Sequence, residues 1–317
     1  NAAKGNFVRT FDVSGEFTLL TKTLGGKVIK MDGSNGILNP LEILRAGDNE
    51  SISFTRHISK VSTFYKLLVG GKVEAEEIVE FEEMLRELYK EFGFDNEVGS
   101  KQKQFTGLPA TSYPTFSDFL KSATKNIKEM QSKKYSKLEE QVVVKTLILR
   151  DKIVKIIRNI VKTYGKLFDG YTTIDNITDE QIITFDLSIL KELKPEVFDA
   201  SIINMISLCW DNCVTNGKLM QKSLDDGSIK MWDVVKTLIL IDESHRWLNA
   251  KKVQALDLIS IYLREARKYF GGIGLASQRI ADYAPEGSGN EGIEKLKNIF
   301  ELTQYKFIFR QNSNAQK

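Results

Sequence analysis

VVKTLILIDES, residues 234–244, is an apolar run that ends in two acids and a serine. Because the run lacks the polar alternation of a half-exposed strand, it predicts a strand buried on both faces, as in a parallel sheet covered by helices. Asp242 and Glu243 follow this strand directly, and open parallel sheets bind ligands beyond the carboxyl ends of their strands. The alternative interpretation is a strand that merely ends in two exposed acids.

Short strands and helices alternate on both sides of this run. The further predicted strands are NFVRTF (6–11), GGKVIKMDG (25–33), IITF (182–185), GGIGLASQ (271–278) and YKFIFRQ (305–311). Helices are expected after Gly15, over 195–216 and over 251–269. This alternation predicts an α/β fold with a mostly parallel sheet flanked by helices.

Residues 54–166 show helical periodicity and almost no strand pattern, so we expect an all-α insertion between core segments 1–53 and 167–317. Ser117 is the predicted N-cap of one of its helices. Ten acids and two bases give residues 73–97 a balance of −8, whereas thirteen bases and four acids give residues 121–166 a balance of +9. These charges either neutralise each other within one subunit or pair between neighbouring subunits. The basic helix face is either solvated or a surface for nucleic acid or a protein partner.

Composition excludes several classes of protein. The chain has 317 residues and a net charge of +3, which is too small to indicate nucleic acid or an anionic membrane as a partner. Cys209 and Cys213 lie four residues apart on one helical face, which predicts buried thiols, and with only His57 and His245 the sequence offers no zinc constellation. No apolar run approaches the roughly 18–20 residues that a transmembrane helix needs.

The two acids suit the chemistry of a P-loop NTPase. In such a site the first acid, Asp242, positions hydrated Mg²⁺, and the second, Glu243, orients or deprotonates the attacking water. Gln278 ends the next strand and can sense a γ-phosphate through a hydrogen bond. Arg264 and Arg267, on the intervening helix, can reach a neighbouring subunit's nucleotide as fingers. The alternatives are an exposed helix face for the arginines and an ordinary polar strand end for Gln278.

Seven segments together resemble the C-terminal ATPase domain of the VirB4 family, the cytoplasmic motors of type IV secretion and conjugation machines. The segments are FDVSGEF (11–17), GILNPLEI (36–43), YPTFSDFL (113–120), FDGYTTID (168–175), ITFDLSIL (183–190), LILIDESHRWL (238–248) and GLASQ (274–278). The likeness covers nearly the whole chain, and its opening segment is most similar to versions from Gram-positive conjugative elements.

The resemblance implies a RecA-like ATPase core that uses ATP and Mg²⁺ and works as a hexamer or dimer. It also implies a location in the cytoplasm at the inner face of the cell membrane. The expected partners are membrane-embedded channel subunits, a coupling protein, and DNA or protein cargo. Carried over by position, Asp242 and Glu243 match the Walker B acids, Gln278 the sensor, and Arg267, with Arg264 as second choice, the arginine finger. Glu16 matches an acidic position near the nucleotide.

The sequence departs from the family at the phosphate-binding loop. No G-x-x-x-x-G-K-[ST] string occurs in the 317 residues, and the lookalikes at 25–27 and 70–72 have Val28 and Val73 where the hydroxyl should be. The resemblance implies that this loop lies upstream of Asn1, and that the family pattern also continues beyond the last residue. Two other functions stay open: a DNA-pumping translocase of the HerA and FtsK kind, and a non-catalytic assembly scaffold.

Overall fold

The computed structural model describes residues 5–34, 36–47, 49–70, 73–94, 104–174 and 180–309. The chain divides into two compact units. The first, here called the sheet unit, comprises Asn1–Met31, Asn176–Ile202 and Leu208–Lys317. The second, the helical unit, comprises Asp32–Asp175 and Ile203–Ser207.

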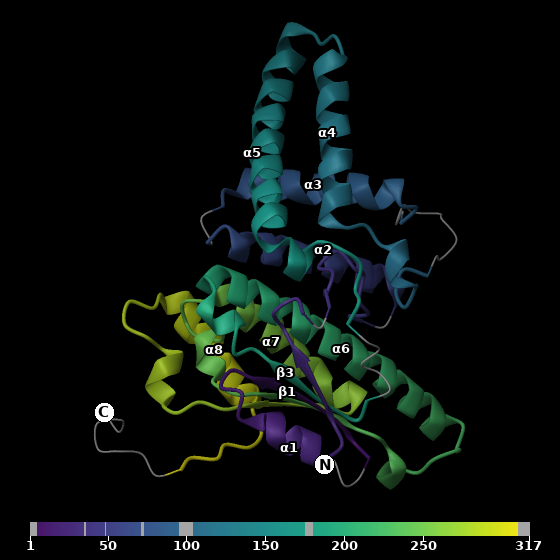
Figure 1. Cartoon of the computed structure of the whole chain (residues 1–317), viewed down its shortest axis with the longest axis vertical. Coiled ribbons are helices and arrows are strands. Elements are labelled where there is room, and N and C mark those ends of the chain that lie inside the picture. Colours follow the sequence, from purple (N-terminus) through teal and green to yellow (C-terminus); the bar gives the residue numbers. More distant parts are fainter. Residues whose placement is uncertain are drawn as a thin grey trace. The chain divides into compact units, whose positions relative to one another are not determined.

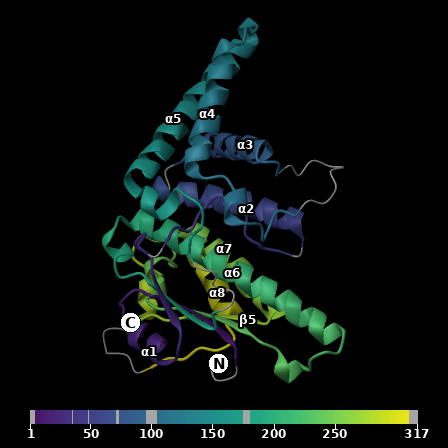
Figure 2. The ribbon, with the colours of Figure 1, turned by 45° about the vertical axis from the view of Figure 1, so that its right-hand side comes forward.

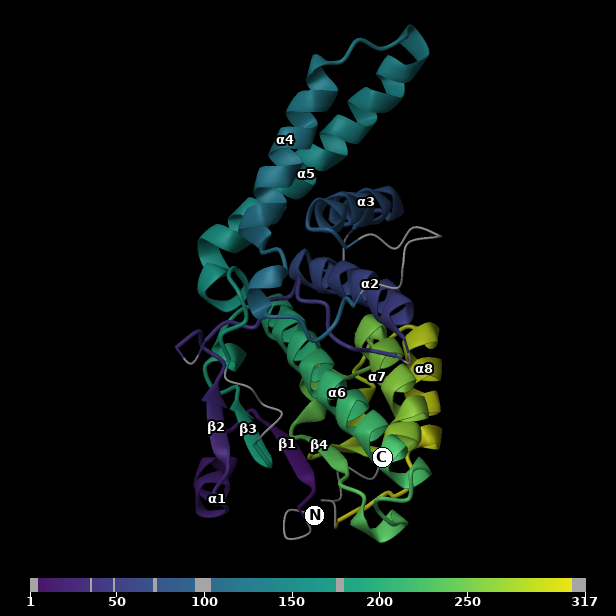
Figure 3. The ribbon, with the colours of Figure 1, turned by 90° about the vertical axis from the view of Figure 1, so that its right-hand side faces the viewer.

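The sheet unit contains five strands that are all parallel to their neighbours. They are β1 (Phe7–Asp12), β2 (Lys27–Lys30), β3 (Ile182–Asp186), β4 (Thr237–Ile241) and β5 (Gly271–Leu275). Their order across the sheet is β2-β3-β1-β4-β5, and Figure 3 labels β2, β3, β1 and β4 in this order. After β1 the chain forms the edge strand β2, returns to place β3 between β2 and β1, and then adds β4 and β5 on the other side of β1, which makes the β1–β4 boundary the switch point of the sheet.

Helices cover both faces of this sheet. They are α1 (Phe17–Thr23), α6 (Pro195–Asp225), α7 (Val253–Ala266) and α8 (Asn290–Leu302). Figure 1 shows α1 on one face and α6, α7 and α8 on the other. The packing is aromatic in part: the rings of Phe11 and Phe185 lie 5.2 Å apart, and Trp210 stacks on Tyr262 at 4.5 Å. The predicted α/β fold with a parallel sheet is confirmed.

Short 3₁₀ helices punctuate the connections. In the sheet unit they are η3 (Leu190–Glu192), η4 (Met231–Asp233), η5 (Ser244–Arg246), η6 (Arg267–Tyr269) and η7 (Ile280–Tyr283). Pro195 stands in the first turn of α6, where its missing N–H costs nothing. Cys209 and Cys213 are both free and buried in α6, as predicted, and burial raises the pKa of each thiol to about 12.

One predicted strand is wrong. Tyr305–Phe309 is not a strand, and the side chains of Tyr305, Phe307, Ile308 and Phe309 are exposed. Among the described residues no strand pairs with this segment, so it lacks the ladder of hydrogen bonds that defines a strand. The last two residues of the predicted strand, 310 and 311, lie outside the described part of the chain.

In its described residues, the helical unit contains four long helices and the short η2 (Ala110–Ser112). The long ones are α2 (Glu50–Leu68), α3 (Ala75–Glu91), α4 (Phe116–Ser132) and α5 (Lys137–Phe168). No strand occurs among the described residues between 32 and 174. Figure 2 shows α4 and α5 as a hairpin with α3 beside it. The boundaries predicted for the insertion, residues 54–166, stay a prediction.

The predicted N-cap of α4, Ser117, is wrong by two residues. Thr115 caps the helix through a reciprocal capping box with Asp118. Ser117 instead lies inside the first turn, where its hydroxyl donates to Asp169 Oδ2 at 2.6 Å. Ser136 caps α5 with a second capping box, closed by Glu139.

The acidic helix α3 pairs with the basic helix α5 inside the chain. Arg150 Nε lies 2.6 Å from Glu80 Oε1, and its NH2 group lies 2.8 Å from Glu87 Oε1. Lys152 Nζ lies 2.5 Å from Glu77 Oε2, and the Glu77 side chain is fully buried. Part of the opposite charge of the two halves is therefore neutralised within one subunit.

Candidate functional site

The candidate site lies where β1, β4 and β5 end. The register pairs Phe11 with Ile241 and Ile241 with Leu275, so the three strands end side by side. Asp242 and Glu243 leave β4 at this edge, and Gln278 follows β5 by three residues. The structure thus brings together three of the predicted residues at the switch point of the sheet.

Glu243 has an unusual backbone conformation. Its φ of 47° and ψ of 38° lie in the left-handed region, which costs a non-glycine residue of order 1 kcal/mol or more. The turn aims its carboxylate at two partners: Gln278 Nε2 donates to Oε1 at 2.9 Å, and His245 Nδ1 lies 3.4 Å from Oε2. The side chain is only 13% exposed. Glu243 therefore accepts a hydrogen bond at Oε1 and has the imidazole of His245 beside Oε2.

The turn after Glu243 is fastened to the end of β5. The Ser244 N–H donates to the Ala276 carbonyl at 2.9 Å, and the Ser244 hydroxyl lies 2.9 Å from the same oxygen and 2.6 Å from Tyr283 Oη. Ser277 Oγ lies 3.0 Å from His245 Nδ1. The sequence analysis did not single out His245 for this site, or Ser244, Ser277 and Tyr283. The position of His245 only two residues after Glu243 in the sequence could have identified it as part of the site.

Asp12 organises the loop between β1 and α1. It is fully buried, and its carboxylate accepts hydrogen bonds from the N–H groups of Ser14, Gly15, Glu16 and Phe17 at 2.7–3.2 Å. The N–H groups of this loop, together with that of Phe17 at the first position of α1, are therefore already taken by a negative charge and are not offered to a phosphate. The sequence analysis missed this role, although an Asp before a Ser-Gly turn is a typical capping pattern.

Carboxylates dominate the electrostatics of this edge. Burial raises the pKa of Asp242, the hydrogen bond from the Glu243 backbone lowers it, and the negative charges of Glu243, Asp12 and Glu16 raise it further, with a net upward shift. A carboxyl group whose ionisation is disfavoured in this way is stabilised by a cation.

The donor set fits Mg²⁺ better than an all-protein metal cage. Among the described residues no group of three or more His, Cys, Asp or Glu side chains is arranged to hold a metal. Mg²⁺ in nucleotide sites takes only one or two carboxylates and completes its shell with water and phosphate oxygens. Asp242 is half-buried at the switch point and suits that limited role, while Glu16 is exposed at the start of α1.

The two predicted arginines lie elsewhere. Arg264 is near the end of α7, and Arg267 opens η6, which directly precedes β5. Because β5 begins beside the first residue of β4, both arginines lie toward the opposite edge of the sheet from Asp242 and Glu243. Both are exposed, so they do not join their own chain's acids, and a role on a neighbouring subunit stays a prediction.

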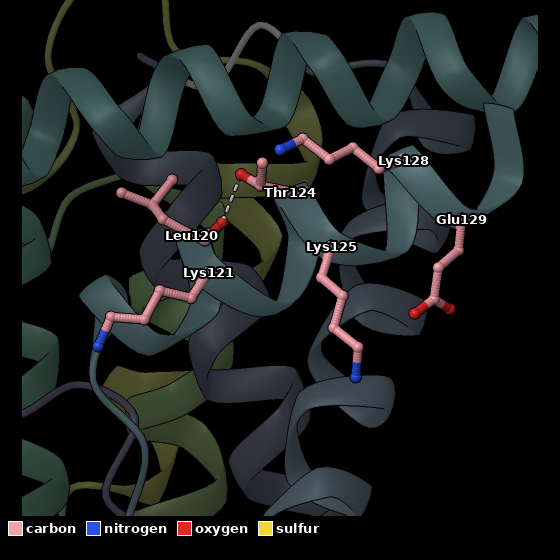
Figure 4. Close-up of a pocket in the computed structure, with 6 residues that line it drawn as sticks. All are labelled: Leu120, Lys121, Thr124, Lys125, Lys128 and Glu129. Carbon is pink, nitrogen blue, oxygen red and sulfur yellow. Dashed lines mark hydrogen bonds between the residues drawn. The ribbon is translucent and has the colours of Figure 1, made fainter. Parts of the chain in front are cut away.

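A shallow hollow lies on α4 of the helical unit, shown in Figure 4. Its lining is Leu120, Lys121, Thr124, Lys125, Lys128 and Glu129. The lining offers three ammonium groups but no paired acid and base, so it does not resemble a catalytic centre.

None of the described helices is both long and apolar enough to cross a membrane.

Comparison with known proteins identifies the fold. No family model matches the chain. An uncharacterized protein of Bacillus anthracis, pXO2-09, is 28% identical over 327 aligned positions that cover 99% of this chain and 49% of that protein, so the chain spans about half the length of this curated relative. The structure of VirB4 of Thermoanaerobacter pseudethanolicus superposes with a TM-score of 0.70 at 19% identity, over 95% of this chain and 68% of that one. The resemblance predicted from the sequence is thus confirmed, and the chain has the fold of VirB4 over nearly its whole length.

Proposed function

We propose that the chain is the ATPase core of a VirB4-like motor, which hydrolyses ATP to power assembly or substrate transfer by a type IV secretion or conjugation machine. The observation that carries this proposal is the contact between Glu243 and Gln278, beside Asp242, at the switch point of a parallel sheet. The VirB4 fold supports the same assignment.

In the proposed reaction each residue has a separate task. Asp242 would hold hydrated Mg²⁺, which, when bound, neutralises charge on the phosphates. Glu243 would accept a proton from the attacking water at a carboxylate oxygen, and the Gln278 amide would donate to the γ-phosphate. Glu16 would contribute negative charge near the metal. Arg267, or else Arg264, would reach the nucleotide of a neighbouring subunit and stabilise charge in the transition state.

Phosphate affinity needs groups other than the loop before α1, because Asp12 already accepts the N–H groups of this loop and that of Phe17. The glycine-rich loop that usually supplies them does not occur in these 317 residues. Tests of nucleotide chemistry are therefore designed for the intact gene product that contains this chain.

The proposed setting follows from the same resemblance. The motor would work as a hexamer or dimer in the cytoplasm, at the inner face of the cell membrane. Its partners would be membrane-embedded channel subunits and a coupling protein, and its cargo DNA or protein.

Steady-state ATP turnover of the intact gene product tests the proposal. We expect Mg²⁺-dependent hydrolysis that stops when the metal is chelated. Stimulation by DNA would favour a HerA- or FtsK-like translocase instead. A folded protein that neither binds nor hydrolyses ATP would support the scaffold and contradict the proposal.

A further inference from the structure

His245 occupies a junction between the two strand ends of the site. Its Nδ1 lies 3.4 Å from Glu243 Oε2, which follows β4, and 3.0 Å from Ser277 Oγ, which follows β5. The side chain is 19% exposed, and the Tyr283 ring meets the imidazole edge-on at 6.4 Å. The titratable groups around it are Glu243, Asp282 and Tyr283.

The hydrogen bonds assign the proton of the imidazole. The Ser277 hydroxyl donates to the Arg279 carbonyl at 3.2 Å, which leaves its oxygen free to accept. The Glu243 carboxylate also accepts. The tautomer with the hydrogen on Nδ1 suits both neighbours, and on this ground we assign His245 as the donor.

The two donors that hold Glu243 differ in their freedom to move. Gln278 is exposed and lies three residues beyond the end of β5. His245 sits in η5, whose first residue, Ser244, is fastened to Ala276 and Tyr283. If Gln278 turns from Glu243 to a γ-phosphate, only the anchored donor is left on the carboxylate.

We propose that His245 is a positioning residue that keeps the Glu243 carboxylate oriented toward the water when Gln278 engages the γ-phosphate. This inference rests on the proposed ATPase function. It predicts that loss of His245 lowers kcat and leaves KM nearly unchanged, because His245 acts on the base and not on the bound nucleotide.

The test uses ATP turnover by the intact gene product. His245→Ala should lower kcat roughly tenfold, a typical cost of a misplaced catalytic group, with KM changed less than about threefold. His245→Asn should recover most of the loss, because the Asn amide offers an N–H close to the position of Nδ1. In a Glu243→Gln background, His245→Ala should cause no further loss. Arg246→Ala, an exposed residue of the same turn, is the matched control and should keep wild-type turnover.

Three outcomes would overturn the inference. One is wild-type kcat in His245→Ala. The second is an equal further loss in the Glu243→Gln background, which would mean that His245 acts independently of Glu243. The third is a loss that Asn does not recover and that follows a fall in melting temperature, which would reveal a structural role. Absence of turnover in the wild-type protein would instead refute the proposed function, and the inference with it.

Discussion

The acids of the two units have opposite surroundings. In the helical unit, Glu77, Glu80 and Glu87 each meet a cation from α5, at 2.5–2.8 Å. In the sheet unit, burial and the negative charges of Glu243, Asp12 and Glu16 raise the pKa of Asp242. In the described part of the chain, no Lys or Arg forms an ion pair with Asp242 or Glu243. The carboxylate of Glu243 instead contacts the side chains of His245 and Gln278.

This difference separates acids that build the fold from the acids for which we propose a chemical role. A buried acid with its own cation is satisfied, and removing the cation costs stability. An acid cluster without a cation destabilises the folded chain and is retained where a ligand supplies the charge. We therefore expect substitutions in α3 and α5 to change stability, and substitutions at the sheet edge to change activity. The predictions below test this separation.

The largest effect is expected at Glu243. In the intact gene product, Glu243→Gln should leave nucleotide binding intact and lower turnover on the order of a hundredfold or more, as expected for loss of a general base. Binding is measured by calorimetry and turnover by phosphate release. Glu286→Gln, an exposed acid of the same unit, is the control. Undiminished turnover in Glu243→Gln would place the base elsewhere.

Arg150 should dominate the stability of the helical unit. Its side chain is 6% exposed, and its removal leaves Glu80 and Glu87 without their cation. We expect Arg150→Ala to cost about 2–3 kcal/mol, less than for a fully buried pair because Glu87 is 32% exposed. Urea denaturation gives the value. Arg158→Ala, exposed on the same helix, should stay within about 0.5 kcal/mol, and equal losses in the two variants would refute the pairing.

Asp12 is both an acid that builds the fold, through its hydrogen bonds to the loop before α1, and a member of the acidic edge beside Asp242. It therefore tests the separation between structural acids and acids of the proposed site. Asp12→Ala removes the acceptor of four backbone N–H groups and should cost about 1–2 kcal/mol in thermal or urea denaturation. Asp12→Asn keeps one acceptor oxygen and should lose less. Equal losses for Ala and Asn would show that the charge, and not the capping geometry, matters at this position.

The fold was predictable because it depends on local patterns. Unalternating apolar runs such as 237–241 mark buried parallel strands, and acids directly after them must lie at the carboxyl edge of the sheet. This rule placed Asp242 and Glu243, and the end of the next predicted strand placed Gln278; the resemblance to VirB4 assigned the same three residues. The rule failed at 305–309, where the composition suits a strand but no described strand pairs with it.

The rest of the site depends on contacts between distant segments. Ser277 and Tyr283 reach the η5 turn only because β5 lies beside β4, which local periodicity does not encode. The left-handed backbone of Glu243 is likewise imposed by tertiary structure, because glutamate has no intrinsic preference for it. In the helical unit, charge balance predicted that acids and bases meet, but not that Arg150 would take two acids at once.

The pH dependence of stability should expose the cost of the sheet-edge acids. The folded-state pKa of Asp242 lies above its ordinary value, so its ionisation disfavours the folded chain, and stability from this group is lost as pH rises through that pKa. Asp242→Asn should therefore raise the free energy of unfolding at pH 7, without metal or nucleotide, by less than about 1 kcal/mol. The gain should be visible as a higher melting temperature. The gain should shrink as the pH falls below the folded-state pKa. A loss of stability at pH 7 would mean that Asp242 is a structural acid.

The smallest change in stability and turnover is expected for substitutions of the exposed basic residues of α5. Lys155 and Arg158 are exposed on α5, whereas Lys152, on the same helix, reaches the buried Glu77. If opposite charges pair only within the subunit, reversing Lys155 and Arg158 to Glu should change stability by no more than about 0.5 kcal/mol and leave the mass of the intact gene product and its turnover unchanged.

Reversing Lys152 alone should cost more stability, because it places a second acid against Glu77. If the exposed bases instead bind the acidic helix of a neighbouring subunit, the double reversal should lower both mass and turnover at low salt, while the wild-type assembly should dissociate as salt is raised. Light scattering and ATPase rates on the same samples decide between these outcomes. A loss of assembly without unfolding would show that α5 holds two sets of bases, one that builds the subunit and one that joins subunits.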